Sequence, residues 1–263
     1  MLPSDPAVAE LLTRGRIEVE GRLVDASNAT LFCEISGAGE VAHCVYKPVS
    51  GERALWDFPD GTLAGREIGA YFVSEAAGVH LVPPTVLRAG PFGPGMVQLW
   101  VDTKEGDDLV DVVAPKDVPP GWRRVLRAHD RFGEPAVLAH SDHPSIRLMA
   151  ALDVLINNAD RKGGHVLHAT DGNVYGVDHG ICLHTEHKLR TVLWGWVGEP
   201  LPEDVLEMLG TLRAGMPALA ESLAEHLTRA EIRALRARLD ELERTAVFPT
   251  PGADYRAIPW PAF

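Results

Sequence analysis

The sequence predicts an α+β fold of two lobes, with an antiparallel β-sheet and one helix in the N-lobe and a mainly helical C-lobe. Three observations support this fold. Short runs of alternating apolar and polar residues, typical of half-buried strands, dominate the first hundred residues. A single helical pattern interrupts these strands. Beyond residue 101 the chain turns acidic and carries prolines, and amphipathic helical patterns follow. We therefore expect an N-lobe at 1–101, a hinge or linker at 102–120 and a C-lobe at 121–263.

The composition bounds the class of protein. The chain has 263 residues, enough for a sizeable core, and 25 Lys+Arg against 37 Asp+Glu give a formal net charge of −12. This charge argues against nucleic-acid binding and against docking on anionic lipid. No apolar run reaches the roughly 18–20 residues of a membrane span, and the N-terminal residues lack a signal-peptide core. The 3 cysteines have no metal-like spacing. We therefore expect a cytoplasmic protein without an integral membrane segment.

The N-lobe is predicted from five strands and one helix. Ile17, Val19 and Leu23 alternate with charged residues and a turn follows at 25–28, so the first two strands should form a hairpin. Between the third and fourth strands, apolar residues recur at helical spacing, and Gly78 stands where a glycine commonly ends a helix. The expected elements are strands at 16–24, 30–35 and 41–46, a helix at 62–77, and strands at 82–88 and 96–101.

The C-lobe is predicted from three helical patterns and one short strand. Residues 146–155 are apolar on most sides, as in a buried helix, and residues 173–177 form a strand-like run. A short amphipathic helix is expected around 205–212. The best-specified helix begins at Thr228, because Thr228 and Glu231 have the spacing of a capping box. Its apolar stripe consists of Ile232, Leu235, Leu239 and Leu242.

The loop after the 146–155 helix carries residues suited to phosphoryl transfer. That reaction needs a cation on the phosphates, a carboxylate beside the acceptor hydroxyl and ligands for a divalent metal. Asp160 follows the helix, Lys162 comes two residues later and His165 five residues later. Asp178 comes directly after the next strand and beside a glycine-bearing turn, from which it can bind a metal through oxygen. Asp160 and Lys162 are the candidate catalytic residues, and His165 and Asp178 are the candidate metal ligands.

This spacing resembles the catalytic loop of protein kinases, and the Asp160-Arg161 pair is closer to the phosphatidylinositol 3-/4-kinase superfamily. The 177–180 stretch, Val-Asp-His-Gly, resembles the metal-binding Asp-Phe-Gly motif with His in place of Phe. The resemblance is strongest to type II phosphatidylinositol 4-kinases and to an uncharacterised actinobacterial PI3/PI4-kinase-like group. It covers roughly residues 17–198 and implies a two-lobed protein-kinase-like fold with ATP and Mg²⁺ or Mn²⁺ as cofactors.

The same resemblance assigns an ion pair to the N-lobe. The 45–48 stretch, Val-Tyr-Lys-Pro, is similar to the superfamily's third strand, whose lysine holds the nucleotide phosphates. Lys47 takes that place in this sequence. Glu67, in the helix that follows, matches the partner of the lysine. Neither residue would stand out on its own, so the role of Glu67 depends on that of Lys47.

Further nucleotide contacts are expected from two places in the N-lobe. The turn near residue 28 lies where the superfamily has a phosphate-covering loop, which makes Ser27, Asn28 and Thr30 candidate ligands of the phosphates. Gln98 and Trp100 belong to the strand that leads into the hinge. Two interpretations of this strand stay open: it meets adenine through backbone groups with Trp100 packed on the ring, or Trp100 is an ordinary core residue.

The sequence departs from the family pattern in two ways. Ser, Asn and Ala replace the glycine-rich loop, and His165 stands where the family has an Asn as second metal ligand. Imidazole suits Mn²⁺ or Zn²⁺ better than Mg²⁺, which prefers oxygen ligands. The departure therefore indicates either a shifted metal preference or a weakened second metal site.

Two classes of function follow. The favoured one is an ATP-dependent phosphotransferase that moves the γ-phosphate to a hydroxyl acceptor, which is a small molecule, a lipid headgroup or a protein. The alternative is a nucleotide-binding pseudokinase that acts as a regulatory module, favoured by His165 and the missing glycine loop. Transfer of a nucleotidyl group stays open. The 188–196 segment combines two cations with two tryptophans, which fits either an anionic acceptor or a loop packed on the C-terminal helices.

Overall fold

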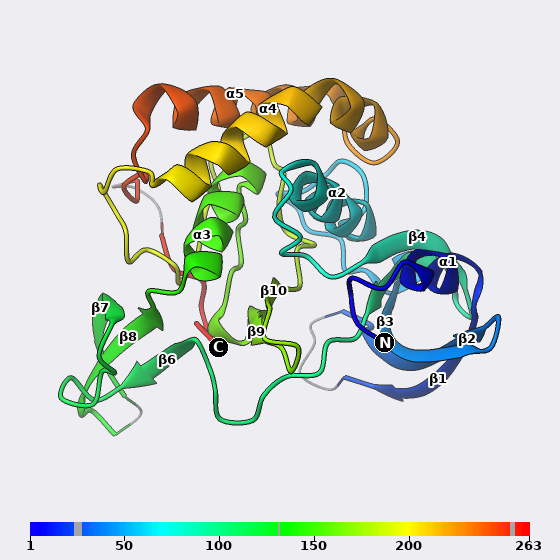
Figure 1. Ribbon diagram of the computed structural model, residues 1–263, viewed down its shortest axis with the longest axis horizontal. Coiled ribbons are helices and arrows are strands. Elements are labelled where there is room, and N and C mark those ends of the chain that lie inside the picture. The colour runs from blue at the N-terminus through cyan, green and yellow to red at the C-terminus, as the bar shows by residue number, and fades with distance from the viewer. Residues whose placement is uncertain (24–27, 131, 253–255) are drawn as a thin grey trace.

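The computed structural model describes residues 1–23, 28–130, 132–252 and 256–263. A sheet-rich N-terminal part and a helical part lie side by side, and α2 lies between them (Figure 1). The elements in order are α1 (Ala7–Arg14), β1 (Arg16–Arg22), β2 (Leu31–Gly37), β3 (Glu40–Pro48), the 3-10 turn η1 (Val49–Gly51), α2 (Leu63–Ala76), β4 (Thr85–Gly90), β5 (Gly93–Leu99), β6 (Val110–Val113), β7 (Trp122–His129), β8 (Pro135–Ser141), α3 (Pro144–Ile156), the 3-10 turn η2 (Gly163–His165), β9 (Val166–His168), β10 (Val174–Gly176), α4 (Glu203–Leu223) and α5 (Arg229–Thr245).

The N-terminal part is a five-stranded antiparallel sheet in the order β1-β2-β3-β5-β4. Helix α1, which the sequence analysis did not anticipate, packs on the sheet through Leu12. Its partners include Ile35 on β2, Tyr46 on β3 and Val97 on β5, all buried. Lys47 follows Tyr46 on β3, and because successive side chains of a strand point to opposite faces, it leaves this core. The sheet thereby presents Lys47 towards the second part of the molecule.

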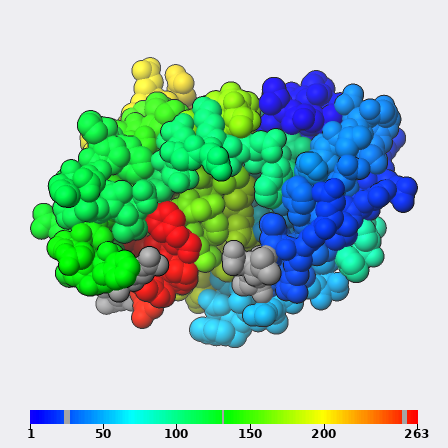
Figure 2. All heavy atoms as spheres, turned by 90° about the horizontal axis from the view of Figure 1, so that it is seen from below, coloured from blue at the N-terminus to red at the C-terminus, as the bar shows by residue number. Residues whose placement is uncertain are grey.

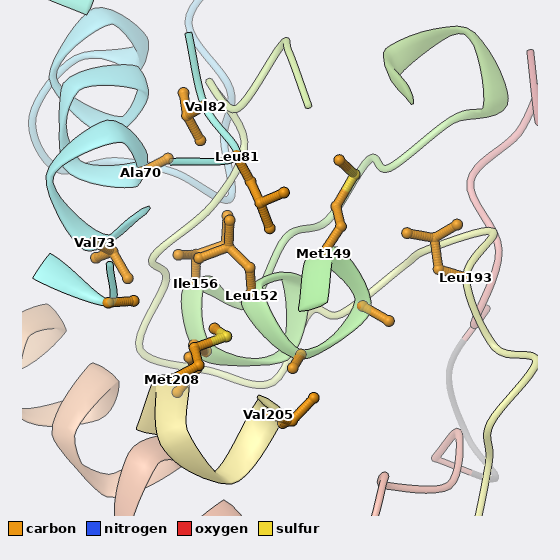
Figure 3. Packing of buried hydrophobic residues seen from close by; sticks show 14 of the residues in the cluster. Ala70, Val73, Leu81, Val82, Met149, Leu152, Ile156, Leu193, Val205 and Met208 are labelled. Atoms are coloured by element: carbon orange, nitrogen blue, oxygen red, sulfur yellow. The ribbon is translucent and has the colours of Figure 1, made fainter. Parts of the chain in front are cut away.

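The helical part has its own core, and α2 belongs to it. Figure 3 shows Ala70 and Val73 of α2 close to Ile156 and Leu152 of α3, with Met208 of α4 below them. All five residues are buried. Burial of aliphatic side chains stabilises such packing by roughly 1.5–3 kcal/mol for each large residue. The helix that carries Glu67 is therefore fixed to the helical part, although the chain enters it from the sheet.

Residues 102–141 correct one expectation. The sequence analysis expected mainly helix after the acidic segment, but β6, β7 and β8 form a three-stranded antiparallel sheet in the order β6-β8-β7. Two features hid these strands. Strand β8 is buried along most of its length and so lacks alternation, and β7 shifts register between Arg124 and Leu126. Strand β6 lies within 102–120, the segment expected as a hinge.

No helix in the described part of the chain is long and apolar enough to cross a membrane. The cysteines at 33, 44 and 182 are free thiols, and each is buried. Cys33 and Cys44 face each other across β2 and β3. They pack there as small apolar residues, in line with the absence of a metal-like spacing.

Candidate functional site

A cavity of about 60 Å³ lies where the sheet meets the helical part. It gathers residues that are far apart in the sequence: the β1–β2 turn, the end of β3, the start of α2 and two loops of the helical part. Polar side chains make up much of its wall. The lining residues are Asn28, Ala29, Thr30, Lys47, Pro48, Glu52, Leu63, Ala64, Glu67, Asp160, Asp178, Gly180 and Ile181.

Lys47 joins the two parts of the molecule inside this cavity. Its ammonium group donates to Glu67 Oε1 at 2.6 Å and to Asp178 Oδ1 at 2.7 Å. The second oxygen of Glu67 accepts the backbone N–H of His179 at 2.8 Å. Strand β3, helix α2 and the loop after β10 thus meet at one cation; the pair of Lys47 and Glu67 is the one that the family resemblance implied, and the contact with Asp178 adds to it.

These contacts shift the pKa values of Lys47 and Asp178. Burial alone would lower the pKa of Lys47, but the carboxylates of Asp178 and Glu67 outweigh it and raise that pKa. The ammonium of Lys47 in turn lowers the pKa of Asp178. Asp178 has a backbone φ of 60°, in the left-handed region that non-glycine residues avoid. Such strain costs about 1–3 kcal/mol and is typical of functional sites.

Asp160 lines the same cavity from the loop after α3. Burial raises the pKa of its carboxyl group, and the nearby charge of Asp178 adds to the effect, while Lys162 opposes it. Lys162 Nζ lies 3.6 Å from Asp160 Oδ2. A carboxylate with a raised pKa is a better proton acceptor than one in water. Asp160 and Lys162 therefore lie side by side, although Lys162 does not line the cavity.

His165 lies behind Asp178 and outside the cavity lining. Its Nε2 is 3.4 Å from Asp178 Oδ2, and burial lowers the pKa of its imidazole to about 4, so the ring is neutral near pH 7. Its Nδ1 accepts a long hydrogen bond, 3.5 Å, from the backbone N–H of Lys162. A neutral ring that accepts at Nδ1 carries its proton on Nε2, which then points to Asp178. The two candidate metal ligands are thus adjacent.

Arg161, for which no sequence pattern predicted a role, holds the loop of Asp160 in place. Arg161 is fully buried, and its guanidinium binds both oxygens of Asp153 on α3 through Nε and Nη2. The same guanidinium donates to the carbonyls of His165 and Val177 and lies 2.6 Å from His179 Nε2. Arg161 thereby ties the loop of Asp160 to the loop of Asp178. A buried Asp within the apolar 146–155 helix was the available signal.

Glu52 is a second residue that sequence reasoning missed. Its carboxylate accepts the backbone N–H groups of Leu63 and Ala64, at 2.9 and 2.8 Å, and so caps the first turn of α2 together with Thr62. Glu52 lines the cavity next to Lys47. The amides of a helix N-terminus attract anions, and here a side chain of the protein occupies them. No local pattern marks this contact, because it bridges a loop.

Of the other residues predicted to contact the nucleotide, some line the cavity and others do not. Asn28 and Thr30 line the cavity, whereas Ser27 lies outside the described residues. Gln98 is buried in the sheet, where its amide donates to Thr85 Oγ1 at 2.8 Å. The backbone N–H of Trp100 binds the carbonyl of His43, and its ring meets Phe32 edge to face. The structure does not bring Gln98 and Trp100 to this cavity; Gln98 is buried, whereas Trp100 is half-buried and belongs to none of the hydrophobic clusters of the described residues.

The 188–196 segment packs against the rest of the protein. Lys188 is buried and binds Asp57 at 3.2 Å, and the ring of Trp196 is 2% exposed. The indole N–H of Trp194 donates to the carbonyl of Ala257. These partners fit the packed-loop interpretation rather than a free anion site.

Comparison with known proteins identifies the relatives of the chain. Protein Rv2133c of Mycobacterium tuberculosis is 53% identical over 263 residues, which cover 96% of this chain and 94% of that protein. The chain belongs to the Rv2133c family. No model of a known protein family matches this member of the Rv2133c family.

Solved structures similar to this chain include two kinases. The Golgi casein kinase aligns with a TM-score of 0.50 at 13% identity, over 97% of this chain and 78% of that one. The Helicobacter pylori proinflammatory kinase CtkA aligns with a TM-score of 0.49 at 12% identity, over 90% of this chain and 95% of that one. The Golgi casein kinase match shows that this chain has a two-lobed protein-kinase-like fold. The closer resemblance to PI3/PI4 kinases stays a prediction.

Proposed function

We propose that this chain is a kinase that transfers the γ-phosphoryl group of ATP to a hydroxyl acceptor with the help of a divalent metal. One observation carries the proposal: the ammonium of Lys47 joins Glu67 and Asp178 at a cavity that Asp160 also lines. A cation for phosphates, a carboxylate for a metal and a carboxylate for the acceptor are the parts that phosphoryl transfer needs. Three separate segments of the chain supply them.

Each residue has a role in this proposal. Lys47 binds the nucleotide phosphates and is held by Glu67. Asp160 orients the acceptor hydroxyl and takes its proton, for which the raised pKa of its carboxyl group suits it. Lys162, beside Asp160, stabilises charge on the phosphoryl group in transfer. Asn28 and Thr30 bound the cavity on the side where the β- and γ-phosphates are expected.

The donor set fits a divalent metal. Asp178 offers carboxylate oxygens and His165 a neutral imidazole 3.4 Å away. Oxygen ligands suit Mg²⁺, and an added imidazole shifts the preference towards Mn²⁺. A bound metal would neutralise charge on the phosphates. His165 joins such a site only if its proton moves from Nε2 to Nδ1, so Asp178 is the principal ligand and His165 an auxiliary one.

Transfer from radiolabelled ATP tests the proposal. The protein is incubated with ATP labelled at the γ- or the α-phosphate, Mg²⁺ or Mn²⁺, and candidate small-molecule, lipid and protein acceptors. We expect label from the γ-position alone in the acceptor, and its loss in Asp160→Ala. Asp108→Ala, a change of an exposed aspartate that does not line the cavity, is the matched control. Label from the α-position would instead indicate nucleotidyl transfer.

A pseudokinase is the second candidate, and the contact of His165 with Asp178 favours it. His165 Nδ1 accepts the backbone N–H of Lys162, so the proton of the neutral ring is on Nε2, 3.4 Å from Asp178 Oδ2. In this tautomer the ring has no free nitrogen for a metal beside Asp178. A protein that binds nucleotide without transferring phosphate with any acceptor or metal, and whose Asp160→Ala variant behaves identically, would be a pseudokinase.

A further inference from the structure

Residues 256–263, here called the C-terminal segment, lie against the catalytic loop. Figure 1 shows the chain ending beside β9, and Figure 2 shows this segment exposed on one face next to the 160–180 region. The carbonyl of Ala262 accepts the backbone N–H of Gly163 at 2.8 Å. The carbonyl of Ala257 accepts the backbone N–H of Thr191 at 3.0 Å and the indole N–H of Trp194 at 2.8 Å. Both ends of the segment are thus held through their carbonyl groups.

The seat of this segment requires a glycine at position 163. A Cβ atom there would lie 2.0 Å from Phe263 Cε1 and 2.5 Å from its Cζ, far inside van der Waals contact. Nothing lies within 4 Å of the corresponding position at Gly164. Gly163 has no positive φ, so the requirement comes from the space that the Phe263 ring takes. The ring of Phe263 in the C-terminal segment therefore packs directly against Gly163 in the loop of Asp160.

The two largest side chains of the segment are largely exposed, since Trp260 is 85% exposed and Phe263 is 50% exposed. Pro259 is buried, and Ile258 and Ala262 are partly buried against the hydrophobic core. Segments with little buried apolar area open at low free-energy cost. The C-terminal segment can therefore leave its seat without unfolding the rest of the protein.

The segment lies against the loop that carries Asp160 and Lys162. Gly163 follows Lys162, whose ammonium lies 3.6 Å from Asp160 Oδ2. None of the described residues of the segment lines the cavity of Lys47 and Asp178. A polypeptide in the place of the segment would therefore lie beside the loop of Asp160 and leave the cavity free. Three N–H donors, from Gly163, Thr191 and Trp194, face the segment's backbone, and such donors recognise an extended polypeptide.

We propose that the C-terminal segment is an autoinhibitory strand that occupies the docking groove of an extended polypeptide acceptor. The proposal rests on the kinase function proposed above. It adds that the acceptor is a protein, and that the acceptor must displace Phe263 from the face of Gly163. Transfer to a small molecule would need no such displacement.

Binding of a peptide in trans tests the groove without reference to activity. The probe is a fluorescent peptide with the sequence of residues 256–263. We expect Phe263→Ala, in the full chain, to bind it about tenfold or more tightly than the wild type, because the weakened segment no longer competes. Phe263→Ala combined with Gly163→Ala should not bind it, whereas Phe263→Ala combined with Gly164→Ala should. Equal binding by all variants, or by none, overturns the proposal.

Hydrogen exchange and transfer complete the test. The amide of Gly163 should exchange about tenfold faster or more in Phe263→Ala than in Trp260→Ala, whose side chain is exposed. Transfer from ATP to a degenerate Ser/Thr peptide library should rise in Phe263→Ala and stay at the wild-type rate in Trp260→Ala. Faster exchange without faster transfer, in a protein that does transfer phosphate, overturns the autoinhibitory role.

The two proposals fail in different ways. If ATP binds but no variant transfers phosphate, the proposed kinase function is wrong. The inhibitory role of the segment is then wrong as well, whether or not the fluorescent peptide binds. If the wild type transfers phosphate to peptides at the rate of Phe263→Ala, the kinase function stands and the autoinhibitory strand does not.

Discussion

Arg66 Nη2 and Glu231 Oε1 lie 2.5 Å apart in the interior, although 165 positions separate these residues in the chain. Their side chains are 1% and 4% exposed. Arg66 precedes Glu67, so the pair anchors to α5 the turn of α2 that carries the partner of Lys47. The guanidinium also donates to the carbonyls of Cys182 and Asp60. The geometry of the cavity therefore depends on a contact that lies outside it.

Breaking this buried pair should destabilise the protein strongly. Glu231→Ala leaves the guanidinium of Arg66 buried without a carboxylate and removes the acceptor of the Thr228 N–H at the start of α5. We expect a loss of about 3–5 kcal/mol in the free energy of unfolding, measured in urea. Glu241→Ala, which removes the exposed partner of Arg244, should cost less than about 1 kcal/mol. Similar losses in the two variants would contradict the anchoring role of Arg66 and Glu231.

Breaking the buried pair of Asp153 and Arg161 should also destabilise the protein strongly. Asp153 is fully buried and accepts from Arg161, from Asn158 Nδ2 and from Thr191 Oγ1. Asp153→Ala leaves these donors unsatisfied and should cost about 3–5 kcal/mol of unfolding free energy. Asp204→Ala is the matched control, because it removes a partly exposed partner, that of Arg147, and should cost about 1 kcal/mol or less. A loss of unfolding free energy in Asp153→Ala as small as that in Asp204→Ala would show that other contacts hold the loop of Asp160 in place.

His140 should make the stability depend on pH. Its ring is buried, and Nε2 accepts the backbone N–H of Gly195 at 3.0 Å. Burial lowers its pKa to about 4, against about 6.5 in an unfolded chain. Between these values the unfolded state binds more protons, so the free energy of unfolding should fall as pH drops from about 6.5 to about 4, by up to roughly 3 kcal/mol from this group.

Urea unfolding at several pH values between 4 and 7 measures that slope. His140→Gln should reduce it, because glutamine cannot take up the proton. An unchanged slope in His140→Gln would mean that other groups, such as the partly buried His165 and the buried His179, account for the pH dependence.

Much of the N-terminal part could be predicted from local patterns. Alternation marked β1 to β3, and the Thr228–Glu231 spacing marked the start of α5, where the structure has the capping box. These signals are local because turns, caps and half-buried strands are determined by neighbouring residues. The pairing of Lys47 with Glu67 was predicted from a family resemblance and is present, whereas the hydrogen bond of Lys47 with Asp178 was not predicted.

The missed features have tertiary causes. Strands β6 to β8 carry no clear alternation, so their pairing could not be seen before the sheet was assembled. Glu52 reaches the amides at the start of α2 across a loop, and Gln98 turns to Thr85 because the strand buries its amide. The seat of Phe263 on Gly163 joins positions 100 residues apart, which no periodicity reveals.

Thermal unfolding with ATP tests the central claim most directly. The protein is heated with ATP and Mg²⁺ or Mn²⁺, as wild type, Asp178→Ala and the control Asp108→Ala. Ligand at about 100 times its dissociation constant adds roughly 2.7 kcal/mol, a rise of a few degrees in Tm for a chain of this size. We predict a metal-dependent rise in the wild type and the control, and its loss in Asp178→Ala. No rise with either metal in the wild type would contradict the nucleotide site.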